Sequence, residues 1–128
     1  MEFLKQYQVL FKKARTDLKV AKNILEDFED GDEELDLEVI LFHLQQSCEK
    51  LLKALLAYNQ LHFTKTHSLE VLINTIKEQN IELISDIDSL VSLEEYAILH
   101  DDVEDTNKYI QTLDTLLEFV KNKINENQ

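Results

Sequence analysis

The sequence predicts an all-α protein, an antiparallel up-and-down bundle of about four to five helices that forms a single domain over residues 1–128. Its composition favours helices, because the chain has no proline, one glycine and abundant Leu, Lys, Glu and Ile. Tight hairpin turns between strands are therefore unlikely features of this fold. Apolar residues also recur every three or four positions through most of the chain, which is the spacing of amphipathic helices.

The first predicted helix covers about residues 2–29, where the apolar residues fall on one stripe. Gly31 suits the left-handed position just past the end of a helix. The acid-rich run over 26–38 resembles a calcium loop, but aligning Gly31 with the loop glycine puts Phe28 and Leu37 at ligand positions, which excludes that site. We interpret the run as a loop followed by the acid-rich first turn of the next helix.

The second predicted helix covers about residues 34–60 and has a broad apolar face rich in leucine. Glu49 and Lys53 form a favourable i,i+4 pair, and Gln45 lies at the edge of the apolar face, where burial would require hydrogen-bond partners. The opposite side carries polar residues spaced three, four and three apart, which we name the polar stripe: His43, Gln46, Lys50 and Lys53.

Three further helices are predicted in the rest of the sequence. Ser68 is a suitable N-cap for a short helix over about 68–79, and Asn80 marks the turn into a fourth helix over about 81–94. The stretch EEYAILHDD is a predicted connection to the last helix, over about 102–125, whose apolar spacing is close to a heptad.

The formal net charge of −13 argues against a general nucleic-acid binder held by phosphate contacts, and we expect no DNA partner. The charge is unevenly distributed, since residues 1–23 contain only Glu2 and Asp17 as acids. The same segment carries six cations, Lys5, Lys12, Lys13, Arg15, Lys19 and Lys22. A local basic surface on the first helix is compatible with this pattern, although a helix with its own solvated charges is the simpler interpretation.

The sequence predicts a cytoplasmic protein. Cys48 is the single cysteine, so no internal disulfide forms, and its position in the apolar face predicts an inert, buried thiol. The N-terminal residues contain no continuous apolar stretch of a signal peptide. No apolar run approaches the roughly 18–20 residues that span a bilayer, so we expect no membrane contact.

No motif of a metal or cofactor enzyme is present. A di-iron site in a helical bundle would need Glu three residues before His, but those positions hold Ile40, Asn59, Thr64 and Ala97. The sequence also lacks a glycine-rich phosphate loop, zinc-type cysteine pairs and a nucleophile elbow. We therefore expect no metal and no cofactor, and any catalytic site would consist of isolated His, Lys, Asp and Glu residues.

The stretch FHLQQSCEKLLKALLAYNQ, followed by TKTHSLEVL, resembles the HEPN domain, a helical bundle of prokaryotes and some eukaryotes. Members of that family have a helix of the form H-x-Q-Q-x-x-E-K-x-L-K-A-L-L and then a T-H-x-L motif. The first helix is similar to the family pattern A-x-x-D-L-x-x-A. The matching residues are His43, Gln45, Gln46, Glu49, Lys50, Leu52, Lys53, Ala54, Leu55 and Leu56, then Thr66, His67 and Leu69, and in the first helix Ala14, Asp17, Leu18 and Ala21.

The resemblance implies a protein that pairs with a minimal nucleotidyltransferase and binds nucleotide or substrate for it, as a homodimer and in some cases within a toxin–antitoxin pair. Other members are metal-independent RNases, with an Arg followed four to six residues later by His. Here the only arginine is Arg15, and the positions before His100 that should hold Arg are Leu93, Glu94 and Glu95. We therefore expect a non-catalytic partner protein. The alternative is an RNase toxin that uses His100 with an unusual helper such as Lys108.

The candidate residues for contacting nucleotide, RNA or the partner protein come from the polar stripe, the T-H motif and the segment before the last helix. They are His43, Gln46, Lys50, Lys53, His67, His100 and Asp101. No catalytic residue is assigned, except His100 if the protein is an RNase. Four of the candidates also have a structural interpretation: Lys50 and Lys53 as solvated lysines, His67 as a residue that orients its own turn, and His100 as an ordinary loop residue. A plain structural bundle, kept soluble by its polar stripe, is the third interpretation.

Overall fold

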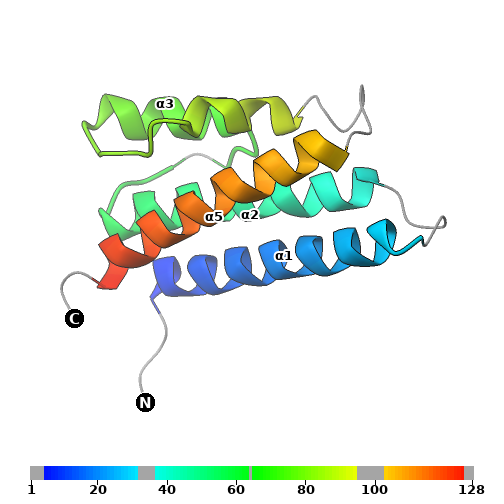
Figure 1. The fold of residues 1–128 in the computed structure, drawn as a ribbon. Coiled ribbons are helices and arrows are strands. Elements are labelled where there is room, and N and C mark those ends of the chain that lie inside the picture. Colours follow the sequence, from blue (N-terminus) through cyan, green and yellow to red (C-terminus); the bar gives the residue numbers. More distant parts are fainter. Residues whose placement is uncertain (1–4, 32–36, 64, 95–102, 126–128) are drawn as a thin grey trace, which may run out of the picture.

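A computed structural model describes residues 5–31, 37–63, 65–94 and 103–125 of the chain. Within those ranges the chain is helical and contains no β-strand, so the predicted all-α bundle is confirmed (Figure 1). The elements are α1 (Gln6–Glu29), α2 (Leu37–Tyr58), α3 (Leu69–Glu78), the 3-10 helix η1 (Ile87–Ser92) and α5 (Val103–Asn125).

The long helices α1 and α2 form an antiparallel hairpin, and α5 lies across both of them (Figure 1). Contacts between α1 and α5 fix the direction of α5, because Asn107 reaches Glu29 while Asp114 reaches Lys22. The last helix is therefore antiparallel to α1 and runs in the same direction as α2. The short helix α3 packs on another side of α2, and η1 packs against α3 and α5.

Helix α2 is the centre of the core. It packs against α1, α3 and α5, and none of its residues from His43 to Tyr58 is exposed. The fully buried leucines of α2 meet Ala14 and Ala21 of α1, whose small side chains let the two helices approach closely. A helix enclosed on three sides has no fully solvated face, and this decides the environment of its polar residues.

Three helices are followed by a residue with left-handed backbone, which the sequence predicted for Gly31, and the predicted turn at Asn80 is also present. Gly31 has φ +101° after α1, Gln60 has φ +59° after α2, and Asn80 has φ +58° after α3. The predicted N-cap of α3 is also confirmed, since the Ser68 hydroxyl accepts a hydrogen bond from the amide of Val71 at 3.3 Å.

The prediction of a fourth α-helix over 81–94 is wrong in helix type and in its start. The chain becomes helical only at Ile87, as the 3-10 helix η1, and Leu93 and Glu94 continue as helix. The apolar residues of this segment lie three positions apart, which matches the three residues per turn of a 3-10 helix better than the 3.6 of an α-helix. Ser89 and Ser92 also donate their hydroxyls to backbone carbonyls three residues back, an arrangement that competes with α-helical bonding.

The remaining boundaries agree with the predicted helices as far as the described residues reach. The predicted first residues of the first two helices, and the connection that follows Glu94, lie outside them.

Candidate functional site

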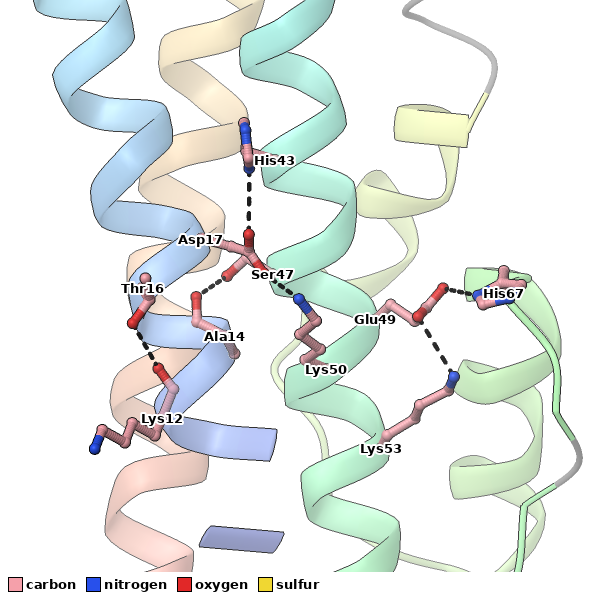
Figure 2. Close-up of polar contacts among 10 residues, drawn as sticks. All are labelled: Lys12, Ala14, Thr16, Asp17, His43, Ser47, Glu49, Lys50, Lys53 and His67. Atoms are coloured by element: carbon pink, nitrogen blue, oxygen red, sulfur yellow. Dashed lines mark hydrogen bonds and ion pairs between the residues drawn. The ribbon is translucent and has the colours of Figure 1, made fainter. Parts of the chain in front are cut away.

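Half of the polar stripe lies at the seam between α1 and α2. We name Asp17, His43 and Lys50 the Asp17 cluster (Figure 2). One carboxylate oxygen of Asp17 lies 3.2 Å from His43 Nδ1, and the other accepts a hydrogen bond from Lys50 Nζ at 2.5 Å. The three side chains are 15%, 26% and 24% exposed respectively, so all three are half-buried and partly accessible to solvent.

The register of the two helices is fixed directly beneath this cluster. The Ser47 hydroxyl, fully buried, donates a 2.8 Å hydrogen bond to the backbone carbonyl of Ala14 (Figure 2). That bond satisfies a polar group that would otherwise destabilise the core. It also holds Asp17, one turn further along α1, between His43 and Lys50.

The Asp17 cluster can orient an imidazole and hold an anion weakly. A neutral His43 that donates Nδ1–H to Asp17 keeps Nε2 as an acceptor, and a protonated His43 forms an ion pair instead. Lys50 neutralises the carboxylate but has three N–H donors, of which Asp17 takes one. The remaining donors are the chemical means by which this cluster could contact a phosphate.

Lys53, another residue of the stripe, lies on the α3 side of α2. We name Glu49, Lys53 and His67 the Glu49 cluster (Figure 2). Glu49 has a side chain only 5% exposed, and its carboxylate lies 3.4 Å from Lys53 Nζ and 3.0 Å from His67 Nδ1. His67 is 82% exposed, whereas Lys53 is 13% exposed and lies over the ring of Phe63 at 5.8 Å. A buried carboxylate paired with both Lys53 and His67 ties the segment before α3 to the central helix.

The first turn of α3 is held by a second carboxylate. Glu94 accepts a hydrogen bond from the backbone N–H of Leu69, the first residue of α3, beside the Ser68 cap. An acceptor at this position satisfies an amide that has no partner within the helix, and its negative charge favours the positive end of the helix dipole. Glu94 therefore has a structural role.

Cys48 lies between these two carboxylates in the core. Complete burial raises the pKa of its thiol, and the negative charges of Glu94 and Glu49 raise that pKa further. The sulfur therefore stays protonated at neutral pH and is a poor nucleophile, in agreement with the predicted inert thiol.

The sequence model of the HEPN domain matches residues 7–125, nearly the whole chain. The chain belongs to the HEPN domain family. No curated protein and no solved structure matches it. Within the described part of this HEPN domain, no group of three or more His, Cys, Asp or Glu residues could hold a metal ion, and no helix is both long and apolar enough to cross a membrane.

The HEPN fold divides the predicted stripe between two separate clusters. His43 and Lys50 belong to the Asp17 cluster, Lys53 joins His67 in the Glu49 cluster, and Gln46 is half-buried on α2. His100 and Asp101 lie outside the described residues.

The interpretation of Lys50 and Lys53 as solvated lysines is wrong, because both side chains are largely buried and ion-paired. His67 does not orient its turn through a neighbour in sequence, because its partner is Glu49 on α2. Both corrections have one cause, which is that α1 and α3 cover the sides of α2 on which these residues lie.

Sequence reasoning missed the acidic centres of both clusters. Asp17 was counted only as a charge and as part of a family pattern, although it is the only acid between Glu2 and Glu26. Glu49 was paired correctly with Lys53, but its burial was not expected. The available signal was its position directly after Ser47 and Cys48, on the side of α2 that turns into the core.

Proposed function

We propose that this HEPN domain is a non-catalytic protein that pairs with a minimal nucleotidyltransferase and helps to hold nucleotide or substrate for that enzyme. The observation that carries the proposal is that the charged residues of the polar stripe are engaged with carboxylates of the same chain. Such residues can shape and anchor a binding surface, and Lys50 keeps donors for a phosphate. They are poorly placed to supply an unpaired positive charge to a transition state.

The family's RNase chemistry needs a histidine to move protons and an arginine to stabilise the charge of the phosphorane. The only arginine, Arg15, lies on the exposed side of α1. Two of the positions before His100 where the RNase motif would have its arginine are Leu93 and Glu94. Leu93 is buried in the core, and Glu94 accepts a hydrogen bond from the first backbone amide of α3. These roles support a protein without RNase activity.

An exposed apolar surface on α2 supports a protein partner. Val39 and Phe42 are 45% and 52% exposed, and Glu38 and Gln45 complete a shallow depression of about 360 Å³ around them. The ring of Phe42 meets that of His43 edge to face, with centroids 5.5 Å apart, so this surface adjoins the Asp17 cluster. Exposed aromatic and aliphatic side chains are typical of the centre of a protein interface.

The test is a pull-down of the tagged chain from its native cells, with mass spectrometry of the proteins that co-purify. We expect a small nucleotidyltransferase in a stoichiometric amount. Val39→Ser combined with Phe42→Ser should reduce its recovery about tenfold, because the variant removes apolar contacts at the centre of the proposed interface. Val71→Ser is the matched control, since Val71 of α3 is equally exposed at 45% and should leave recovery unchanged.

Recovery of the chain alone, together with RNA cleavage that is lost in His100→Ala, would overturn this proposal in favour of the RNase toxin.

We also propose that the domain is a homodimer in the cytoplasm and belongs to a toxin–antitoxin pair. A reducing compartment suits the unpaired, buried Cys48. Light scattering of the purified chain tests the dimer, and growth of cells that express the chain with and without its partner tests the toxin–antitoxin pair.

A further inference from the structure

The outer surface of α1 has an unusual charge pattern over most of its length. From Lys5 to Asn23, every exposed residue is either a cation or a neutral polar residue. We name the exposed residues of this stretch the cationic face. They are Lys5, Gln6, Lys12, Lys13, Arg15, Thr16, Lys19, Lys22 and Asn23.

This pattern depends on the direction of one side chain. Asp17 is the only acid of the stretch, and it points away from the cationic face into the seam with α2. Of the six cations, Lys22 alone forms an ion pair with another described residue, Asp114 of α5 at 2.6 Å, and both of those side chains are about half exposed. Among the residues that the structure describes, the charge of the face is therefore largely uncompensated by ion pairs.

The exposed charge then changes sign within one turn. The exposed residues that follow Asn23 along the helix and into its C-cap are all acids, Glu26, Asp27, Glu29 and Asp30. The helix dipole favours acids in the first turn of a helix and bases in its last turn, which is the reverse of the order along α1. The first turn of α1 contains no acid, and its last turn contains no base. The helix dipole therefore does not account for this distribution.

Neighbouring cations on α1 also repel one another. Lys12, Arg15, Lys19 and Lys22 are spaced three, four and three residues apart, so each lies above the next on one side of the helix. Like charges at these spacings destabilise a helix by about 0.2–0.5 kcal/mol for each pair. A surface that only kept the protein soluble would mix both signs.

We propose that the cationic face binds the phosphate backbone of a single-stranded nucleic acid. This inference concerns a different surface from the proposed partner contact and does not rest on the proposed function. The cations from Lys5 to Lys22 extend over about 26 Å of helix axis, at 1.5 Å per residue. From Lys12 to Lys22 they recur about every 4.5–6 Å along the axis, so an extended strand that follows the helix passes one cation after another. The net charge of −13 does not prevent such contacts, because salt screens charges beyond about 8 Å at physiological ionic strength.

A folded acidic protein fits this surface less well. Lysine is depleted in protein–protein interfaces, whose centres are apolar. The large exposed hydrophobic residues of the described structure are Val39, Phe42 and Val71, and none of them belongs to α1. Flexible lysines that contact phosphates one by one need no apolar centre.

Two features favour a single strand over a duplex. The acids that begin at Glu26 end the cationic face, and a flexible strand can turn away from them whereas a rigid duplex laid along α1 would face them. At the other end, a groove of about 780 Å³ continues the face beside Lys5 and is lined by Tyr7, Tyr58 and Gln60 among others. Aromatic side chains beside a basic surface are where unpaired bases stack.

The test is the fluorescence anisotropy of a labelled oligouridylate titrated with the full chain at about 50 to 200 mM salt. We expect binding whose log–log slope against salt is about −2, because each of about three neutralised phosphates contributes about −0.7. Replacing Lys12, Arg15 and Lys19 together by Gln should weaken binding about tenfold or more and flatten the slope.

Lys12→Gln combined with Arg15→Gln is compared with a matched control that replaces Lys65 and Lys77 by Gln. These lysines are exposed elsewhere on the molecule, and their removal changes the net charge by the same amount. The control should bind oligouridylate within about twofold of the parent chain, because contacts to phosphate act locally. Equal losses in the two double variants, or no loss in either, would overturn the proposal.

Competition with other polyanions identifies the ligand class. Unlabelled single strands, of RNA or of DNA, should displace the probe, since the proposed contacts are to phosphates. If polyglutamate of equal charge displaces the probe as well as oligouridylate does, the face binds acidic polypeptides and the proposal is wrong. A duplex that binds more tightly than the single strand would also contradict it.

Val39→Ser with Phe42→Ser should leave this binding intact, so the result is independent of the partner test.

Discussion

Helices α1 and α2 both carry lysines on one side, but the two sets of lysines differ in their surroundings. On α2, Lys50 and Lys53 are largely buried, and each meets a carboxylate. On α1, the cations of the outer surface are exposed, and only Lys22 reaches an acid among the described residues. Residue type alone therefore does not tell a structural lysine from one that is free to bind a ligand.

The difference depends on where the nearest acid points. Asp17 belongs to α1 in sequence but interacts with His43 and Lys50 of α2. The same side chain thus pairs with two side chains of α2 at the seam between the helices and leaves the cationic face, from Lys5 to Asn23, without negative charge. One aspartate separates a structural set of charges from an available one.

The largest expected effect comes from the most deeply buried ion pair. Glu49→Gln should destabilise the fold by about 3 kcal/mol, because it leaves the largely buried Lys53 without a counter-charge. Urea denaturation with circular dichroism measures this loss. Adding Lys53→Met should recover part of it, since the unpaired charge is removed. A double variant as unstable as the sum of the two single variants would mean that the pair is not coupled.

The Asp17 cluster should show the same behaviour on a smaller scale. Asp17→Asn is expected to cost about 1–2 kcal/mol, because the partners of Asp17 are half-buried and water compensates part of the lost interaction. The same denaturation experiment measures this cost. Asp114→Asn is the control, since the pair between Lys22 and Asp114 is about half exposed and should contribute well under about 1 kcal/mol. Equal costs at the two sites would remove the distinction between the seam and the surface.

The smallest effect is expected on the cationic face. Replacing Lys12, Arg15 and Lys19 by Gln should leave stability unchanged or raise it by about 0.5 kcal/mol, because like-charge repulsion is relieved and glutamine is also a good helix former. Thermal unfolding at low and high salt measures this, and the gain should shrink as salt screens the repulsion. Destabilisation by more than about 1 kcal/mol would show that these cations stabilise the fold.

The sequence predicted the helical elements well where the signal was local. Gly31, Ser68 and Asn80 marked helix ends correctly, because backbone conformation and capping depend on a few adjacent residues. The segment over 81–94 was predicted less well. Its apolar residues lie three positions apart, which is the repeat of a 3-10 helix, but a spacing of three also occurs within the three-and-four pattern of an α-helix, so the segment was assigned to the commoner form.

The candidate site was predicted in composition but not in arrangement. A helical wheel of α2 alone places His43, Lys50 and Lys53 on the polar side, and nothing in that segment reveals that α1 and α3 cover this side. The partners come from distant parts of the chain, since Asp17 lies 26 residues before His43 and His67 lies 18 residues after Glu49. Contacts of that kind depend on how the helices are docked, which a single sequence does not specify.

The separation of charge on α1 also affects how the molecule meets other charged bodies. With cations along most of one helix and a strongly acidic remainder, the whole protein has a large electric dipole moment. A polyanion that diffuses near it exerts a torque, which turns α1 toward the polyanion before the surfaces touch. The acidic remainder of the surface repels the same polyanion, so the encounters that lead to binding begin with contact at α1.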